Sequence, residues 1–480
     1  MLEDILRERA KKLEAYKKIG NPYPARVARD ATLAEVAEKF AKFEKSKKSV
    51  SLAGRILSLR DQGKIIFASV SDGTGKFQFV FKKEETENFD VVKQTFEAGD
   101  FAEATGRVFS TVRGEKSLLA KSARLIVKSL RPLPQEWFGL EDIESRLRQR
   151  YLDILLNPEV KETFVKKSLF WNEIRAYSKK AGYLEVETPV LEAVPGGADA
   201  EPFKTHHNAL DTDFYMRISL ELPLKKLLVA GYEKVFELGR IFRNEGVDRE
   251  HLQDYTQMEC YAAYEDYNDM MKFTEGLYKS AIKAVVGSLK TTFGGKTVDW
   301  GKKWPKLDYY ELFEQETGLD LKKATRDELF QKAKTLGLEP ERNLGRGRLI
   351  DVIFKKAARP KLWEPCFIIN QPIDISPLAK RKEDEPDKVE RFQIMAAGTE
   401  VGNGFSELND PIDQRKRFEE QMRLRAEGDK EAQRLDEEFL LALEYGMPPS
   451  SGFGMSERLF AVIMDKPVRE TVIFPLMKPR

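Results

Sequence analysis

The pattern of apolar and polar positions changes several times along the chain, and each change predicts a different kind of element. Residues 2–19 place apolar side chains at helical spacing and stop at Gly20 and the NPYP turn, which predicts an amphipathic helix. A second short helix is expected over 31–46. From Val50 the pattern changes to five short strand-like runs punctuated by glycines, with a helix-prone stretch at 83–98 after the third. This order predicts a five-stranded OB-fold β-barrel.

A second pattern begins after RPLP (131–134), whose prolines suit a linker because proline interrupts both helices and sheets. Long helical patterns alternate with antiparallel-looking strand pairs, and there is no βαβ repetition. We therefore predict an α+β protein with an N-terminal domain at 1–134 and a second domain at 135–480, an antiparallel sheet flanked by helices. Residues 316–360 look mainly helical and suggest an insertion, whereas 366–376, 389–406 and 470–475 have strand character.

Several classes of protein are disfavoured by what the sequence lacks. Neither GxGxxG nor GxxxxGK[ST] occurs, which argues against a dinucleotide crevice or a P-loop. No apolar run is long enough to span a bilayer, and the charged N-terminus lacks the apolar core of a signal peptide. Two cysteines and three histidines, with no CxxC pair, argue against structural zinc and a disulfide framework. We expect a cytoplasmic protein without a membrane partner.

The net charge of +2 conceals an uneven distribution. Residues 1–150 carry 30 Lys and Arg against 22 Asp and Glu, whereas the remainder carries 51 against 57. A basic N-terminal module is compatible with a polyanionic partner such as nucleic acid, although an ordinary solvated surface explains the same balance.

Three ordered segments together resemble the class II aminoacyl-tRNA synthetases. FWNEIRAYSKKAGYLEVETPV is similar to the first motif of that class, which builds the dimer interface; ELGRIFRNEG with YTQMECYAAY resembles the second, and SGFGMSERLF the third. Within the class, PGGADAEPFKTHHNALD and EVGNGFSELND resemble the lysine enzymes, and the likeness runs from about Ala15 to Arg480. The resemblance implies a lysyl-tRNA synthetase fold and activity: ATP-dependent activation of L-lysine, transfer to tRNA(Lys), a Mg²⁺ requirement and a homodimer.

The resemblance also implies the ATP site. A carboxylate must attack the α-phosphate, so the site needs a fixed cation where negative charge develops. Arg243 matches the arginine that binds both carboxylate and α-phosphate, and Arg458 the one at the triphosphate end. Glu245 would accept from the adenine amino group, Tyr255 would stack on adenine and His251 would reach the terminal phosphates. Taken singly, an arginine is more often a surface ion pair and a histidine more often structural.

Magnesium binding is expected at carboxylate oxygens. Glu400 matches one metal carboxylate of the family, and Glu407 is a weaker candidate. The other family carboxylate corresponds to Gln393, an amide that ligates through oxygen without supplying charge. This departure is either harmless, or it weakens one metal site, moves it, or leaves the ion held by phosphates and water.

The lysine site implied by the resemblance is acidic, because a buried primary ammonium requires a counter-charge. Glu259 and Glu407 would face the ε-ammonium beside Tyr261. Other matched positions would hold the α-amino group or orient the amino acid: Gly197, Glu221, Arg243, Asn403 and Phe405. On a strand, Glu259 and Tyr261 lie on one side, two residues apart. Glutamates in strands usually face solvent, so only the combination favours a pocket.

The third motif departs from the usual GxGxGxDR pattern. SGFGMSER is one residue shorter, with Ser456 and Glu457 before Arg458. Glycines at such a turn allow a backbone to approach a ligand closely, so the shorter turn is expected to affect how Arg458 enters the site.

In the N-terminal barrel, four residues match the anticodon-reading positions of the lysine enzymes. Phe67 would stack on the central uridine, Gln78 and Glu115 would bind base edges, and Arg60 would contact base or phosphate. Phe67 by itself is more often a core residue, and Phe77, Phe79 and Phe81 are expected to include the barrel core.

Three other functions remain open at this stage. An asparaginyl or aspartyl synthetase belongs to the same subclass, although an aspartyl enzyme would need cations where this chain has acids. A degenerate, non-catalytic RNA-binding synthetase would explain Gln393 and the short third motif. Synthesis of diadenosine polyphosphates is compatible with the leading hypothesis.

Overall fold

The computed structural model describes residues 2–134, 142–246, 252–342, 344–429 and 431–479. The chain forms two compact units, Met1–Leu140 and Glu141–Arg480. The boundary expected at residue 134 borders residues outside the described ranges and stays a prediction.

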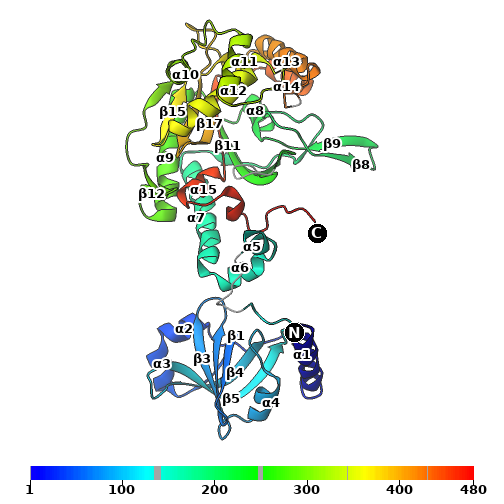
Figure 1. The fold of residues 1–480 in the computed structure, drawn as a ribbon, viewed down its shortest axis with the longest axis vertical. Coiled ribbons are helices and arrows are strands. Elements are labelled where there is room, and N and C mark those ends of the chain that lie inside the picture. The colour runs from blue at the N-terminus through cyan, green and yellow to red at the C-terminus, as the bar shows by residue number, and fades with distance from the viewer. Residues whose placement is uncertain (1, 135–141, 247–251, 343, 430, 480) are drawn as a thin grey trace. The chain divides into compact units, whose positions relative to one another are not determined.

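The first unit is a closed five-stranded barrel in the order β1-β2-β3-β5-β4, and its strands curl around one core in Figure 1. Its alternating phenylalanines point inward, since Phe77, Phe79 and Phe81 are buried, as expected. Helices flank the barrel, with α4 between β3 and β4. The elements are α1 (Leu2–Lys17), α2 (Leu33–Glu38), α3 (Phe40–Ser46), β1 (Ser49–Asp61), β2 (Ile65–Ser71), β3 (Lys76–Lys82), α4 (Phe89–Thr95), β4 (Phe101–Ser110) and β5 (Lys116–Val127).

The second unit is built on an eight-stranded sheet in the order β14-β15-β16-β17-β18-β11-β10-β6. The six central strands pair antiparallel, as expected, and the edge strands β14 and β6 pair parallel to their neighbours. The strands are β6 (Leu184–Glu185), β10 (Lys234–Phe242), β11 (Asp254–Ala263), β14 (Lys306–Asp308), β15 (Cys366–Ile369), β16 (Arg391–Ala396), β17 (Thr399–Ser406) and β18 (Ser450–Ser456).

The two faces of this sheet serve different purposes. Met258, Cys260 and Ala262 of β11 pack into the largest apolar core, which α7 (Pro158–Lys180) and α9 (Tyr267–Val286) complete. Because side chains alternate along a strand, the odd-numbered residues of β11 face the opposite side. There α8 (Glu221–Val229), α13 (Pro411–Ala426) and α14 (Glu437–Glu444) contribute to a second core. Gln257, Glu259 and Tyr261 therefore lie on this second face.

A helical subdomain stands where the sequence predicts an insertion over 316–360. It comprises α10 (Tyr309–Thr317), α11 (Arg326–Thr335) and α12 (Arg346–Ala357), which share their own apolar cluster. The Tyr309 and Phe354 rings stack within it with their centroids 4.3 Å apart. This packing holds α12 against the cavity described below.

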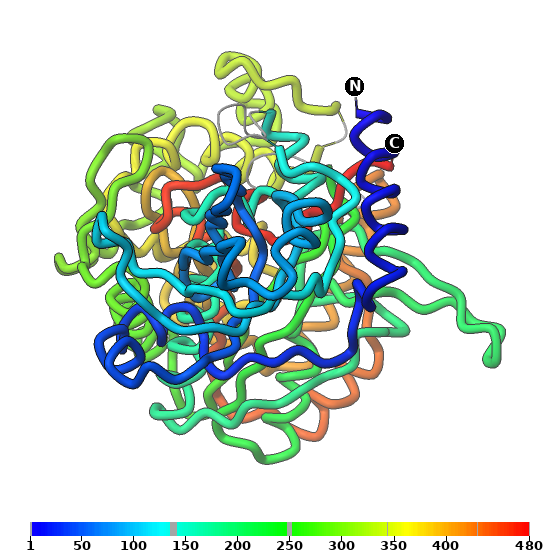
Figure 2. The backbone as a smooth tube through the Cα atoms, turned by 90° about the horizontal axis from the view of Figure 1, so that it is seen from below, coloured from blue at the N-terminus to red at the C-terminus, as the bar shows by residue number. Residues whose placement is uncertain are grey.

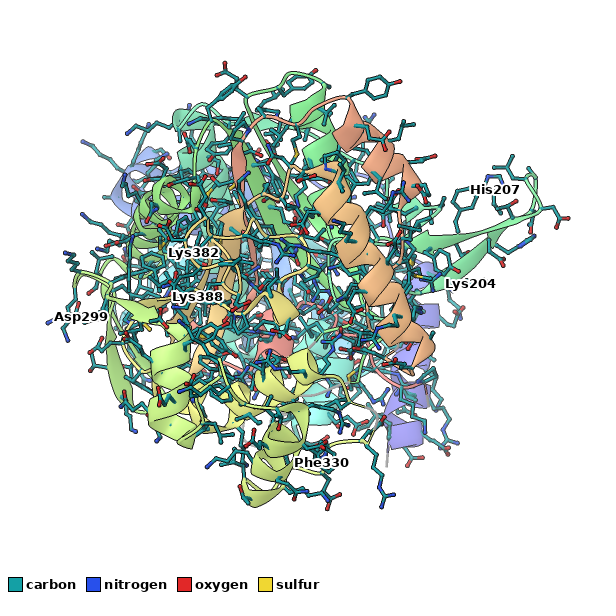
Figure 3. All side chains as sticks on the ribbon, turned by 90° about the horizontal axis from the view of Figure 1, so that it is seen from above. Lys204, His207, Asp299, Phe330, Lys382 and Lys388 are labelled. Carbon is teal, nitrogen blue, oxygen red and sulfur yellow. The ribbon has the colours of Figure 1, made fainter. Side chains whose placement is uncertain are left out.

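The remaining elements are short. The hairpin of β8 (Lys204–His207) and β9 (Thr212–Met216), joined by β7 (Leu191–Glu192), stands out from the body of its unit, and Lys204 and His207 lie along it (Figures 2 and 3). Other elements are α5 (Ile143–Arg148), α6 (Arg150–Leu156), β12 (Lys290–Phe293), β13 (Lys296–Asp299), α15 (Arg458–Ile463) and the 3₁₀ turns η1 (Arg359–Lys361), η2 (Ile373–Ile375) and η3 (Val468–Thr471).

The strand expected at 470–475 is wrong. The 3₁₀ turn η3 occupies its start, and 472–475 is irregular. Pro467 and Pro475 bracket the segment, and proline cannot donate a ladder hydrogen bond. The Thr471 carbonyl instead accepts a 2.8 Å hydrogen bond from Lys167 of α7.

Candidate active site

A cavity of about 690 Å³ opens in the second unit and brings together most of the residues singled out in that part of the sequence. It is bordered by β11, β16, β17, β18, α8 and α12. The predicted residues in its wall are Gly197, Glu221, Arg243, Glu245, Tyr255, Glu259, Tyr261, Gln393, Glu400, Asn403, Phe405 and Arg458. His251 lies outside the described residues, so its expected role stays a prediction.

One face of β11 supplies a row of polar side chains to the cavity. Tyr255, Gln257, Glu259 and Tyr261 are each two residues apart and all line it. The neighbouring strand β18 places Gly454 opposite Glu259 and Gly452 opposite Tyr261. Glycines leave room above these side chains. The strand period therefore accounts for the shared orientation that the sequence predicts for Glu259 and Tyr261.

Glu259 is buried and fixed by several protein donors. Its Oε1 accepts from the Ser219 hydroxyl at 2.7 Å, from the Leu220 amide at 2.9 Å and from the Gln257 side-chain amide at 2.5 Å. Its Oε2 accepts from the Tyr261 hydroxyl at 2.8 Å. These four hydrogen bonds hold the Glu259 carboxyl group in one position beside Tyr261.

Glu221 and Glu407 flank a buried lysine that the sequence reading missed. Lys225 is 0% exposed, and its Nζ forms ion pairs with Glu221, at 2.5 Å, and with Glu407. Burial raises the pKa of Glu221 and of Glu407, and Lys225 only partly offsets this. For Lys225, burial opposes the charged form, but the two glutamates outweigh it and raise its pKa. The acids therefore have a strong attraction for further positive charge.

Glu407 reaches the cavity through the space left by a glycine. It is 1% exposed and does not itself line the cavity. A Cβ added to Gly452, which does line the cavity, would lie 2.4 Å from Glu407 Oε1 and 2.3 Å from the Tyr261 ring. Glu407 Oε1 has no hydrogen-bond donor among the described residues. The acid and the tyrosine thus meet at this point of the wall.

Arg243 follows the end of β10 and points back over the site. Its Nε donates to the Ile218 carbonyl at 3.2 Å, and its guanidinium carbon lies 5.8 Å from the centroid of Tyr255. Burial opposes its charge, yet nearby Tyr255, Glu245 and Glu259 outweigh that and raise the pKa of Arg243. A permanently charged guanidinium beside an aromatic face suits an anionic ligand that carries a planar ring.

The turn after β18 directs two charged side chains differently. Arg458 lines the cavity, and its Nη1 donates to the Glu400 carbonyl at 3.2 Å. Glu457 is 1% exposed and accepts from Lys167 Nζ at 2.5 Å and from the Thr256 amide at 3.0 Å. Glu457 therefore ties α7 to the sheet, which anchors the turn that carries Arg458.

The pair Gln393 and Glu400 lies on adjacent strands at the wall. Gln393 Nε2 donates to Glu400 Oε2 at 3.1 Å. Among the described residues, no group of three or more His, Cys, Asp or Glu side chains is placed to hold a metal ion. A metal here would find one carboxylate and one amide, and would need further ligands from its substrate.

Several lining residues were not predicted. Arg391 donates from Nε to Asn403 Oδ1 at 2.8 Å and so orients that amide. Lys355 and Arg359 bring two cations into the wall from α12 and η1. Arg391 precedes Gln393 by two residues on one strand, and Lys225 follows Glu221 by four residues on one helix. Both spacings place the two side chains on the same face, so the sequence could have indicated Arg391 and Lys225 as further residues of the site. Lys355 and Arg359 have no such signal, because tertiary packing alone brings α12 to the cavity.

The four barrel positions singled out in the sequence lie on or beside the outer surface of the barrel. Phe67 is half-buried on β2, and its side chain points to the side opposite that of buried Ala68, away from the barrel core. The guanidinium carbon of Arg60 lies 5.2 Å from the centroid of the Phe67 ring. Gln78 lies on β3, and its Oε1 accepts from the Ser117 hydroxyl at 2.9 Å. Glu115 is exposed just before β5. Phe67 is therefore not a barrel-core residue.

Comparison with known proteins matches both units. The family described as tRNA synthetases class II (D, K and N) matches residues 142–478, and the OB-fold nucleic acid binding domain matches residues 50–126. A lysine–tRNA ligase of Carboxydothermus hydrogenoformans is 42% identical over 486 residues, covering 100% of this chain and 99% of the relative. The lysine–tRNA ligase of Roseiflexus sp. (strain RS-1) is 43% identical and covers 100% of this chain and 99% of the relative. That of Moorella thermoacetica is also 43% identical and covers 99% of this chain and 98% of the relative.

Across the described ranges, none of the helices combines the length and apolar character that crossing a bilayer requires.

The wall geometry predicts different outcomes for two glycines of one strand. Gly452→Ala is expected to lower the free energy of unfolding by about 1–3 kcal/mol, because its methyl group would overlap Tyr261 and Glu407. Gly454→Ala is the matched control: its Cβ would meet Glu259 no closer than 3.4 Å, an ordinary contact. Thermal and denaturant unfolding measure both; equal effects of the two substitutions would contradict the arrangement.

Proposed function

The chain belongs to the lysine–tRNA ligases, class II tRNA synthetases of the D, K and N group, and from this premise we propose which residues carry out each step. The protein activates lysine with ATP and joins it to tRNA. Full-length similarity at 42–43% identity carries this assignment. The acids gathered on the cavity face of β11 and α8 favour lysine within the group, because aspartate would meet like charge there.

In the proposed lysine site, Glu407 Oε1 and Tyr261 receive the ε-ammonium, and Glu259 lies beside Tyr261. Glu221 receives the α-amino group, close to Gly197, whose φ of +80° suits glycine alone. Other residues shape the walls: Asn403, held by Arg391, and Phe405. A buried ammonium without counter-charges would be costly, so this set discriminates against neutral amino acids.

In the proposed ATP site, Arg243 holds the lysine carboxylate and the α-phosphate together, and Tyr255 and Glu245 receive the adenine. Arg458 binds the triphosphate end, with His251 as the further residue expected there. A lysine carboxylate oxygen attacks the α-phosphorus, the bond to the β-phosphate oxygen breaks and pyrophosphate leaves. Fixed guanidinium groups stabilise the charge that develops on the phosphoryl oxygens, without reorganisation.

In the second step, the terminal ribose hydroxyl of tRNA attacks the lysyl carbonyl, and AMP leaves. The departing phosphate oxygen can accept the hydroxyl proton. No side-chain base is therefore assigned.

Magnesium is proposed at Glu400, with Gln393 as a neutral neighbour. The residues fit an ion that takes most ligands from ATP phosphates and water, as Mg²⁺ commonly does. The ion would supply charge neutralisation on the leaving phosphates. Glu407 is not proposed as a ligand, because its carboxylate is paired with Lys225.

Residues 1–134 are proposed as the anticodon-binding domain and 135–480 as the catalytic domain. Outward-facing Phe67 with Arg60 above it provides a stacking platform, and Gln78 and Glu115 offer polar groups to base edges. The match of residues 50–126 to a nucleic-acid-binding OB fold supports this proposal.

A homodimer in the cytoplasm is proposed as the working form. Val165 and Leu169 of α7 and Leu184 of β6 are 53%, 47% and 49% exposed, an apolar surface that a second copy would cover. Both cysteines are buried and free, which suits a reducing compartment.

The direct test is ATP–pyrophosphate exchange measured with each of the twenty amino acids. Lysine is expected to support exchange at least about 100-fold better than asparagine or aspartate, since a neutral or acidic side chain leaves the buried acids unpaired. Exchange with asparagine and not lysine would reject the assignment. Failure with every amino acid, with tRNA binding intact, would favour a non-catalytic RNA-binding role.

The anticodon proposal predicts a separation of the two steps. Phe67→Ala is expected to reduce tRNA lysylation about 5- to 150-fold, which corresponds to the loss of one base-stacking contact of about 1–3 kcal/mol, while pyrophosphate exchange is unchanged. Phe101→Ala is a matched control, because Phe101 is also half-buried on the barrel with an arginine, Arg55, 4.3 Å above its ring. Loss of both reactions in Phe67→Ala would contradict the proposal.

The single carboxylate at the metal site predicts a response to restored charge. Gln393→Glu is expected to lower the Mg²⁺ concentration for half-maximal exchange by roughly three- to tenfold, because it places a second carboxylate beside Glu400. A tenfold change corresponds to about 1.4 kcal/mol of binding free energy. Calorimetric titration of Mg²⁺ into the ATP complex provides a second measurement. The matched control is Gln421→Glu, because Gln421 also lies in the cavity wall. Gln371→Glu would not serve as a control, because the Gln371 side chain is fully buried. Equal shifts in both variants would refute a specific role for position 393.

A further inference from the structure

Lys225 is a full positive charge placed behind the lysine pocket, where the steps above do not use it. It lies on α8, one turn after Glu221, and is 0% exposed. Its nearest acids are Glu221 and Glu407, and it also lies 5.3 Å from the centroid of Phe405. Among the described residues, Glu221 lines the cavity and Lys225 does not. The ammonium is therefore a wall component, not a surface that substrate reaches.

The two acids that Lys225 holds belong to opposite ends of the proposed substrate site. Glu221 would receive the α-amino group of lysine, and Glu407 the ε-ammonium. Lys225 contacts Oε1 of the first and Oε2 of the second. Glu407 Oε1 remains without a hydrogen-bond donor among the described residues and lies beside Gly452 of the cavity wall. One internal ammonium thus fixes the separation of the two substrate ammonium sites.

Resting on the proposed lysine site, we propose that Lys225 is a positioning residue that sets the spacing between the α-amino and ε-amino subsites and thereby selects the length of the amino-acid side chain. By holding Glu407 in place, it aims the open oxygen at an ammonium four methylenes from the α-carbon. An amino acid one methylene shorter, ornithine, would leave that oxygen unpaired. An unpaired buried charge is far more costly than a missing methylene contact alone.

Lys225 also controls the charge of these acids. The titratable and charged groups around Glu407 are Lys225 and Glu221 from α8 and Glu259 and Tyr261 from β11, and Arg391 acts on Glu221. Burial raises the pKa of Glu407, and Lys225 opposes this. Removing Lys225 would raise the pKa of Glu407 further, so protonation would compete with lysine at a higher pH.

Three variants separate these effects. Lys225→Met removes the charge, Lys225→Arg keeps the charge but changes its reach, and Lys226→Met is the matched control. Lys226 is the next residue of α8, is partly exposed, and has its nearest acid, Glu438, 3.8 Å away. Each is measured as the full chain by pyrophosphate exchange with lysine and with ornithine between about pH 6 and 9. Calorimetry measures ATP binding as the test of folding.

Lys225→Met is expected to raise the KM for lysine at least about tenfold, with the KM for ATP within about twofold of wild type. Its lysine-to-ornithine ratio of kcat/KM should fall at least about fivefold. The acid limb of its pH profile should move to higher pH, because Glu407 would lose the charge that opposes its protonation. Lys225→Arg should retain the wild-type pH profile but lose selectivity, and Lys226→Met should match wild type throughout.

A folded Lys225→Met variant with wild-type selectivity and lysine KM would overturn the proposal. If that variant does not bind ATP, Lys225→Arg decides: a lysine-to-ornithine ratio equal to wild type removes the spacing role. Wild-type protein that shows no lysine-dependent exchange would instead reject the proposed function itself.

Discussion

The burial of carboxylates around an ammonium is the interaction on which the catalytic unit depends. Glu221, Glu259 and Glu407 are each at most 6% exposed, and a protein core tolerates such groups only with counter-charges and donors. Glu259 obtains them from four neighbouring donors, whereas Glu221 and Glu407 share Lys225. Lys225 only partly offsets the cost of burying Glu221 and Glu407. A lysine substrate would supply the further positive charge that these acids attract.

The sheet makes that burial possible by separating its two faces. On β11, Met258, Cys260 and Ala262 pack into the core that α7 and α9 complete, and Tyr261 on the other side joins the second core. That second side also carries Glu259. Gly452 of the adjacent strand leaves the space through which Glu407 meets the cavity, and a larger residue would close it. One side of the sheet therefore serves packing, and the other combines a second apolar core with the polar wall of the cavity.

The departures from the family pattern lie on β16 and in the turn that follows β18. Gln393 donates to Glu400, and Glu457 is engaged with Lys167, so both substitutions have hydrogen-bonded roles in the wall. Lys355 and Arg359 bring additional positive charge to the same cavity. Because cations of the protein can neutralise phosphate charge, a site with one carboxylate remains compatible with ATP use.

The sequence was sufficient to predict the class of fold and the family, because strand alternation, helical spacing and the three ordered motifs are local patterns. It also determined the row of Glu259 and Tyr261 on β11 and the inward phenylalanines of the barrel, since both follow from a period of two. It misassigned 470–475, whose apolar residues resemble a strand although η3 occupies its start and 472–475 is irregular. Tertiary packing decided that Glu407 meets Lys225, that Gly452 opens the wall to Glu407, and that Lys355 and Arg359 reach the cavity from α12 and η1. These contacts join residues far apart in the chain, and only packing brings such residues together, so local periodicity carries no record of them.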